Sequence, residues 1–189
     1  IGSATAGGGA GAVWVVDGQA GGATVNLGSL TTGYRILGQA GEGAGASVSR
    51  TSDLNGDGLE DILIGTASGN AAYLVYGQAG HAEVSLADVA AGTGGLRITG
   101  TNLAGMTVLG NVDLNRDGIE DLVIGTPHDA EGGADAGAVY VVWGDQLYRP
   151  INLAEVAQGI GGAKIVGSAG SLTGSAIAVA GDQNGDGTA

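Results

Sequence analysis

Residues 53–65 read Asp-Leu-Asn-Gly-Asp-Gly-Leu-Glu-Asp-Ile-Leu-Ile-Gly, and residues 113–125 repeat the pattern as Asp-Leu-Asn-Arg-Asp-Gly-Ile-Glu-Asp-Leu-Val-Ile-Gly. Side-chain oxygens fall at loop positions 1, 3, 5 and 9, and a glycine at position 6 permits the sharp turn that directs them inward. Calcium takes about six to eight oxygen ligands and is commonly wrapped by loops of this kind. Each stretch is therefore predicted to hold a hard cation.

The predicted ligands are side chains at four loop positions and the main-chain carbonyl at position 7, where the side chain is apolar. In the first loop they are Asp53, Asn55, Asp57, Leu59 (carbonyl) and Asp61. In the second loop they are Asp113, Asn115, Asp117, Ile119 (carbonyl) and Asp121. A third, partial loop offers Asp182, Asn184, Asp186 and Thr188 (carbonyl). We expect two complete calcium sites and one partial site.

Loop position 12 separates the known loops that begin in this way. An EF-hand needs a glutamate there, followed by a helix, and a dockerin-type loop also needs a carboxylate. Here Ile64 and Ile124 stand at position 12, and glycine follows each of them. The short apolar run before that glycine predicts a buried strand, so the sites are strand-loop-strand. A turn rich in Asp, Asn and Gly that binds nothing is the alternative, and three copies in register disfavour it.

This loop and its surroundings resemble FG-GAP repeats, the blades of the integrin α-subunit β-propeller. The FG position is matched by Tyr76-Gly77 and Trp143-Gly144, with Asp17-Gly18 as a departure, and the GAP position by Gly65-Thr66-Ala67, Gly125-Thr126-Pro127 and Gly2-Ser3-Ala4. The resemblance covers essentially the whole chain, whose Gly- and Ala-rich style looks like the bacterial members found in secreted surface proteins. It implies an all-β fold of propeller blades, each with four antiparallel strands.

The chain is expected to be one FG-GAP region over residues 1–189, with repeat units 1–63, 64–123 and 124–189. Each unit supplies a run of β-formers closed by glycine, a second strand, and a last strand that enters the calcium loop. These last strands are predicted at 45–49, 105–109 and 174–179. A basic residue recurs in the second strand as Arg35, Arg97 and Lys164. We expect it on an outer edge strand, where charge discourages strand addition.

Three units are too few for a closed propeller, which needs about four to eight blades. Two possibilities stay open. The chain is a partial propeller cut from a larger one, or its blades are continued by neighbouring chains. In the second case the terminal strand 174–181 and its half-loop complete a neighbour's first blade, giving a fibre or a ring. The chain lacks an initiator methionine and begins inside a motif, so we expect a processed product or part of a longer polypeptide.

The composition narrows the class of protein. The formal net charge of −13 argues against a nucleic-acid surface. The chain has no cysteine, which excludes disulfides and thiolate zinc sites. No apolar run reaches the roughly 18 residues of a membrane span. Calcium sites with dissociation constants of about 10⁻⁴ to 10⁻³ M saturate only outside the cell, so we expect an extracellular or cell-surface location.

No catalytic constellation is visible, and we do not expect an enzyme. The histidines, His81 and His128, are predicted in exposed loops. The function predicted first is a calcium-binding structural or adhesion module of a surface protein or fibre-like assembly. The resemblance implies protein or matrix partners bound through blade-top loops. The alternative is a carbohydrate-binding or accessory propeller of a secreted enzyme, which exposed aromatic rings would favour. We expect the aromatic residues of the strands to be packed between blades instead: Trp14, Trp143, Tyr73 and Tyr140.

Overall fold

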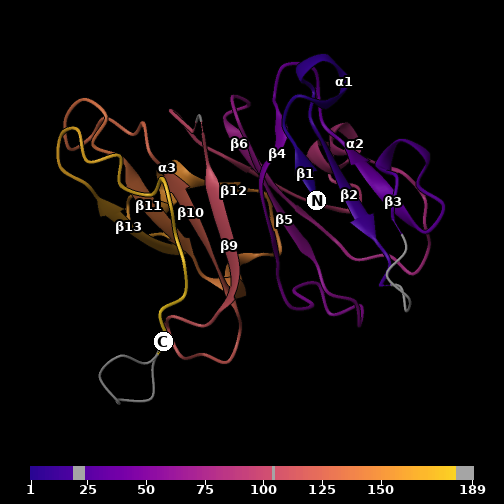
Figure 1. Cartoon of the computed structure of the whole chain (residues 1–189). Helices are drawn as coiled ribbons and strands as arrows, with labels where there is room; N and C mark the ends of the chain where they lie inside the picture. The colour runs from indigo at the N-terminus through magenta and orange to yellow at the C-terminus, as the bar shows by residue number, and fades with distance from the viewer. Residues whose placement is uncertain (19–23, 104, 182–189) are drawn as a thin grey trace.

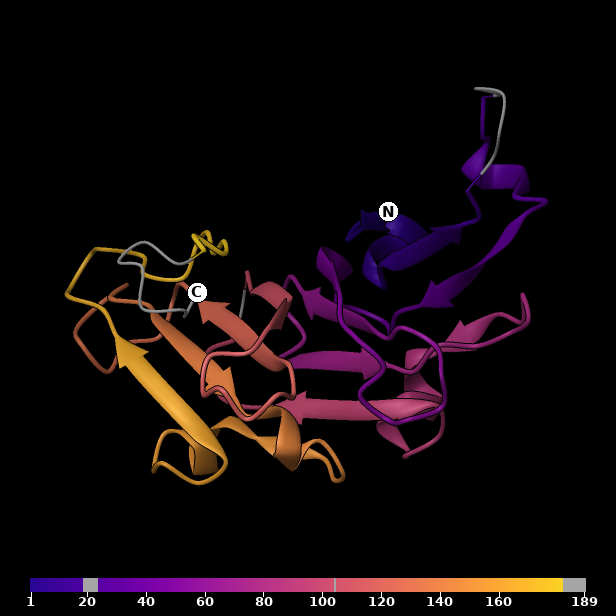
Figure 2. The same cartoon turned by 90° about the horizontal axis from the view of Figure 1, so that it is seen from below.

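The computed structural model describes residues 1–18, 24–103 and 105–181. In it the chain forms three β-sheets that lie side by side in chain order, with the second sheet between the first and the third (Figures 1 and 2). The first sheet contains β1 (Gly2–Ser3), β2 (Ala12–Val16), β3 (Gly33–Leu37) and β7 (Val84–Ser85).

The two other sheets are larger, and only short helical segments accompany them. The second sheet contains β4 (Ala44–Arg50), β5 (Ile62–Thr66), β6 (Ala71–Val75), β8 (Gly95–Thr99) and β12 (Ile151–Asn152). The third contains β9 (Thr107–Val112), β10 (Asp121–Thr126), β11 (Ala138–Val142) and β13 (Gly162–Val166). The helical segments are α1 (Ala6–Gly9), α2 (Leu86–Ala90) and α3 (Leu153–Val156), with 3₁₀ turns at Leu27–Ser29 and Gly144–Gln146.

The predicted all-β fold with four-stranded antiparallel blades is confirmed. Strands β4, β5, β6 and β8 are antiparallel neighbours in the second sheet, as are β9, β10, β11 and β13 in the third. Each acidic loop joins the first strand of its sheet to the second, as the sequence predicts. The first sheet has an antiparallel core of β1, β2 and β3. Within the described residues the three sheets do not close a ring.

Two short strands tie neighbouring sheets together. The chain leaves the second sheet after β6 and forms β7, which pairs in parallel with β3 of the first sheet. In the same way the chain leaves the third sheet after β11 and forms β12, which pairs in parallel with β8 of the second sheet. The prediction that the basic residues lie on edge strands is therefore wrong for Arg35 and Arg97, since β3 and β8 each have neighbours on both sides. The sequence does not show this because the added strands have two residues each.

The hydrophobic core forms two layers, one on each face of the second sheet. Successive side chains along a strand of this sheet point to opposite faces, so each strand contributes to both layers. On β5 and β6, Leu63 and Leu74 face the third sheet, whereas Ile64 and Tyr73 face the first. All four are fully buried. This explains why these strands are apolar at nearly every position, a pattern typical of strands covered on both faces.

The first strands of the second and third sheets approach each other so closely that side-chain hydroxyls bond directly to the neighbouring main chain. Ser47 and Ser49 on β4 accept hydrogen bonds from the N–H groups of Val108 and Gly110 on β9, each at 3.1 Å. A Cβ on Gly110 would lie 2.4 Å from the Thr51 side chain. Small residues on these strands are thus required by the packing, as the sequence indicates.

Replacing Ser47 with alanine is expected to lower the free energy of unfolding by about 1–2 kcal/mol, because the part-buried N–H of Val108 loses its acceptor. Ser47→Thr is the matched control, since it keeps the hydroxyl and the third sheet carries Thr107 at the equivalent position. Urea denaturation of both variants measures the difference. Equal stability of Ser47→Ala and the wild type would contradict the role given to this hydrogen bond.

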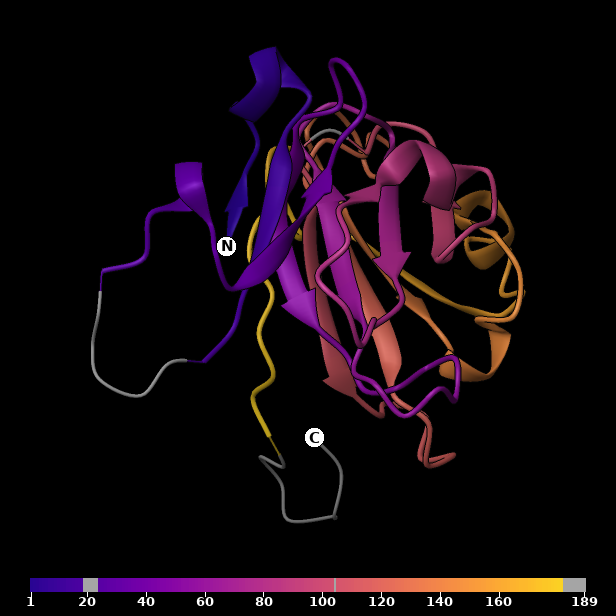
Figure 3. The same cartoon turned by 90° about the vertical axis from the view of Figure 1, so that its right-hand side faces the viewer.

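The strand predicted at 174–179 is not present in the structure. Residues 174–179 contain no β-strand, whereas the predicted strands at 45–49 and 105–109 correspond to β4 and β9. Figure 3 shows this yellow segment running without an arrow beside the sheets. An isolated strand has no hydrogen-bonding neighbour to hold it flat, so the local β-preference is not sufficient.

Candidate metal centres

The acidic loops are folded around their first aspartate. In the first loop, Asp53 Oδ1 accepts from the N–H groups of Gly56 and Asp57 at 2.7 and 3.0 Å, and Oδ2 accepts from Gly58 at 2.6 Å. Gly58 adopts the left-handed φ of +89° that the sequence anticipates at position 6. The N–H of Gly58 and its neighbours lower the pKa of Asp53, so the carboxylate is held ionised.

The third and fifth positions form a second, smaller turn. Asn55 Oδ1 accepts from the N–H of Asp57 at 2.9 Å, and Asn55 Nδ2 donates to Asp57 Oδ2 at 2.8 Å. Asp57 Oδ1 in turn accepts from the N–H of Leu59 at 2.8 Å. The second loop repeats each of these three contacts with Asn115, Asp117 and Ile119. Both loops therefore adopt the same shape, although Arg116 stands where the first loop has glycine.

The aspartate at position 9 is the anchor between the loop and the sheet. Asp61 is fully buried, with Oδ2 accepting from the N–H of Leu54 at 3.0 Å and Oδ1 from Gly77 at 2.9 Å. Asp121 is equally buried and accepts from Leu114 and Gly144. Gly77 and Gly144 are the glycines of the FG position. A Cβ on Gly144 would lie 2.2 Å from the carbonyl oxygen of Glu120, so a glycine is required there.

Negative charge is concentrated at these anchors. Burial raises the pKa of Asp61, and the charges of Asp57 and Asp53 raise it further, against the N–H groups of Gly77 and Leu54. Burial likewise raises the pKa of Asp121, with a contribution from the charges of Asp117 and Asp113. Neither anchor forms an ion pair with a basic side chain among the described residues. A bound cation would relieve this repulsion.

The ten predicted ligands of the two complete loops lie in two loops of matching shape, one between β4 and β5 and one between β9 and β10. The described residues contain no group of three or more Asp, Glu, His or Cys side chains close enough to hold a metal ion by themselves. An ion in either loop would thus draw on the asparagine amide and the position-7 carbonyl as well as carboxylates. The third loop's predicted ligands, Asp182, Asn184, Asp186 and Thr188, lie outside the described residues.

The glutamates at position 8 have a role that the sequence did not indicate. Glu120 of the second loop accepts from the N–H of Ser52, which precedes the first loop, at 2.7 Å. Glu60 of the first loop pairs with Arg50, which also donates to Asn111 at 3.4 Å. These contacts link the two loops to each other. The repetition of glutamate at position 8 was the available signal, but it did not identify the partners: Arg50 in the same unit for Glu60, and Ser52 in the preceding unit for Glu120.

The sequence also did not indicate a polar cluster around Lys164 and Tyr140, which are paired residues of β13 and β11. Lys164 Nζ lies 2.9 Å from Asp129 Oδ2, 2.6 Å from Glu131 Oε2 and 4.9 Å from the centre of the Tyr140 ring. The Tyr140 hydroxyl donates to the same Asp129 oxygen at 3.0 Å. Burial alone would raise the pKa of Asp129, but the Glu131 N–H, Lys164 and Tyr140 outweigh it and lower the pKa. The cluster is a compact, satisfied ion-pair network.

The prediction that the four strand aromatics pack between blades is confirmed for the two tyrosines only. Tyr73 and Tyr140 are buried between sheets, and Trp14 and Trp143 are partly buried. The histidines are exposed, and each contacts one aspartate, His81 with Asp17 and His128 with Asp135. None of the helices in the described parts of the chain has the length and apolar content needed to cross a membrane.

Comparison with known proteins gives two matches. A family model described as FG-GAP repeat matches residues 107–142, which run from β9 through the second acidic loop to β11. Integrin alpha-7 of Mus musculus is 38% identical over 127 residues, which is 62% of this chain and 10% of that relative. The chain thus spans about a tenth of the relative's length. The repeated loops and the blade-like sheets agree with these two matches: residues 107–142 match an FG-GAP repeat, and the chain is similar to an integrin α-subunit.

Proposed function

We propose that this chain is a calcium-stabilised module of an extracellular or cell-surface adhesion protein. The observation that supports calcium most strongly is the pair of matching loops. Each directs carboxylate and amide oxygens around one turn, and each ends on a buried aspartate without a basic partner among the described residues. All-oxygen donor sets of this kind suit calcium and disfavour zinc or copper.

Calcium in this proposal has a structural role. The loop ligands lie between the first two strands of a sheet, and Glu120 bonds the second loop to the segment that enters the first. An ion in each loop would fix these strand connections and thereby the surface that neighbouring loops present. No step of a reaction is assigned to it, and the module acts by binding and not by catalysis.

Binding of a protein or matrix partner is proposed from the similarity to an integrin α-subunit. The test is retention of the 189-residue chain on immobilised collagen, fibronectin and laminin, in millimolar calcium and in excess chelator. We expect calcium-dependent retention on at least one of these proteins, restored when calcium is added back. Retention that is equal in chelator, or absent from all three surfaces, would contradict the proposed adhesion function.

A further inference from the structure

One hydrogen bond joins the two acidic loops directly. Oε2 of Glu120, at position 8 of the second loop, accepts from the N–H of Ser52, which precedes the first loop, at 2.7 Å. The donor and the acceptor are 68 residues apart in the chain, and the bond is part-buried. A hydrogen bond from a main-chain N–H to a carboxylate is roughly twice as strong as a neutral one. This contact can therefore transmit a change in one loop to the other.

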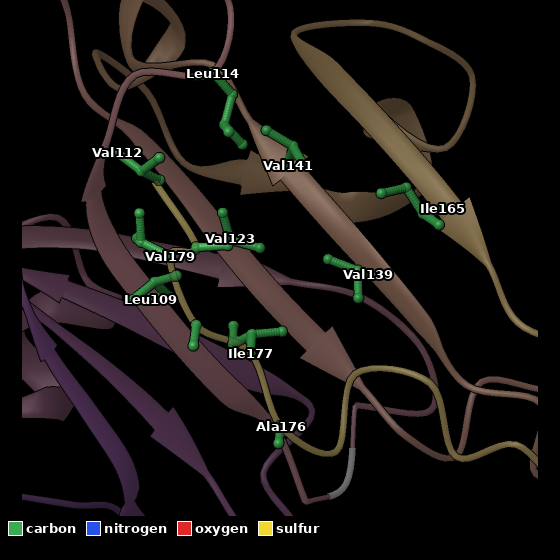
Figure 4. A pocket seen from close by; sticks show the side chains of 12 residues that line it. Leu109, Val112, Leu114, Val123, Val139, Val141, Ile165, Ala176, Ile177 and Val179 are labelled. Carbon is green, nitrogen blue, oxygen red and sulfur yellow. The ribbon is translucent and has the colours of Figure 1, made fainter. Parts of the chain in front are cut away.

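On the side of the second loop, Glu120 lies between two predicted ligands, the Ile119 carbonyl and Asp121. Asp121 is held at the sheet, because it pairs with Val112 of β9 and accepts from the N–H of Leu114 at 2.8 Å. Figure 4 shows Val112 and Leu114 at the end of β9, where the chain enters this loop. An ion bound to Ile119 and Asp121 would therefore fix the main chain on both sides of Glu120.

On the side of the first loop, Ser52 is the residue before Asp53, the predicted ligand at position 1. The Ser52 carbonyl accepts from the N–H of Asp61, the predicted ligand at position 9, at 3.3 Å. The N–H of Thr51 donates to the Asp61 carbonyl at 2.9 Å, and Thr51 is fully buried. A Cβ on Gly110 of β9 would lie 2.4 Å from the Thr51 side chain, so the segment is packed tightly against the third sheet. The position of Ser52 thus sets the positions of both aspartates.

An ion in either loop would order that loop. In the second loop the charges of Asp117 and Asp113 act on the buried Asp121, and like charges repel. A cation among these oxygens would offset the repulsion and hold the loop in one conformation. A loop that is bonded to an ordered neighbour loses less conformational entropy when it binds its own ion. Order in one loop therefore favours binding in the other.

We infer that Glu120 is a positioning residue for the calcium site of the first loop, and that the two sites bind calcium with positive coupling. Glu120 acts through Ser52 on Asp53 and Asp61, the ligands at positions 1 and 9. The inference rests on the calcium sites proposed above and adds how one site controls the other. Coupling between binding free energies is reciprocal, so each ion favours the other by the same factor.

The test is a calcium titration of the 189-residue chain followed by amide NMR, in which Gly58 and Gly118 report on the first and second loops. Glu120→Ala should weaken binding at Gly58 by about tenfold, because a hydrogen bond to a charged acceptor is lost. Glu120→Gln keeps an acceptor and should stay within about threefold of the wild type. Asp145→Ala, which removes an exposed carboxylate, should leave the Gly58 midpoint unchanged. An unchanged midpoint in Glu120→Ala, or equal weakening in Glu120→Gln, would overturn the positioning role.

A double-mutant cycle tests the coupling itself. Asp117→Ala removes a predicted ligand of the second loop, keeps Glu120, and should weaken binding at Gly58 by about fivefold. Asp57→Ala should weaken binding at Gly118 by the same factor, because coupling is reciprocal. In the Glu120→Ala background, Asp117→Ala should have no further effect on Gly58. Asp117 is exposed, so its single variant tests the coupling even where Glu120→Ala does not fold. Equal weakening by Asp117→Ala with and without Glu120 would overturn the proposed route.

Failure of the calcium sites and failure of the coupling give different results in this titration. Without calcium sites, neither the Gly58 nor the Gly118 signal of the wild type would shift with calcium, and both proposals would be overturned. Two signals that saturate independently, with Gly58 unaffected by Asp117→Ala, would leave the calcium sites in place and overturn the coupling alone.

Discussion

Replacing Lys164 with methionine is expected to lower the free energy of unfolding by about 3–5 kcal/mol at neutral pH, the range found when one partner of a buried ion pair is removed. The side chains of Lys164 and Asp129 are only 8% and 9% exposed. Methionine fills most of the space but leaves the Asp129 carboxylate buried without its counter-charge. Chemical denaturation measures the loss.

Glu131→Gln provides the control for this variant. Glu131 also contacts Lys164, but its side chain is 61% exposed, so its loss should cost less than about 1 kcal/mol. A double variant, Lys164→Met with Asp129→Asn, should recover part of the lost stability because no buried charge remains. A Lys164→Met protein as stable as Glu131→Gln would contradict the role given to the cluster.

The defect of Lys164→Met should also depend on pH. In the wild type the pKa of Asp129 is lowered on folding, so its stabilisation is fully present above the ordinary carboxyl pKa and is lost as the pH falls through the lowered value. Without Lys164, burial would raise that pKa instead. The stability difference between the two proteins should therefore be largest near neutrality and shrink in acid.

Calcium is expected to raise the stability of the chain substantially. At a concentration about 100 times the dissociation constant, one site adds about 2.7 kcal/mol. The two complete loops would together add about 5 kcal/mol, which for a chain of this size raises the melting temperature by about 10–20 °C. Thermal melting monitored by circular dichroism, in calcium and in chelator, measures this effect.

Single substitutions test whether the calcium-dependent increase in stability comes from the two acidic loops. Asp57→Ala and Asp117→Ala should each remove about half of the calcium-dependent increment, because each deletes one predicted ligand. Their stabilities in chelator should stay close to the wild type, since both side chains are exposed. Asp88→Ala, an exposed carboxylate in α2, should leave the increment unchanged. An undiminished increment in both loop variants would refute the ligand assignment.

The features predictable from the sequence were those carried by local patterns. The run Ile62-Leu63-Ile64-Gly65 indicates a buried strand on its own, and the Asp-x-Asn-x-Asp-Gly spacing indicates a tight loop around inward-facing oxygens. Repetition at about 60-residue intervals then indicates blades, since one blade cannot bury both faces alone. The fold class followed from these patterns, and so did the common shape of the two loops.

The features that were not predictable depend on contacts between residues that are far apart in the chain. The partners of Glu120 and Lys164 lie 68 and 33–35 residues away in the chain, and nothing local marks them. Strands β7 and β12 have two residues each, too few to show a periodicity. At residues 174–179 the sequence predicted a strand that the structure does not contain, because the local β-preference is not sufficient by itself.

The measurement that tests the central claim most directly is the number of calcium ions bound, by isothermal titration calorimetry. The wild type and the double variant Asp57→Ala/Asp117→Ala are titrated after removal of metal ions with a chelator. We expect the double variant to bind two calcium ions fewer than the wild type. Equal numbers of bound ions in the two proteins, or no binding to the wild type at millimolar calcium, would contradict the assignment of these loops as calcium sites.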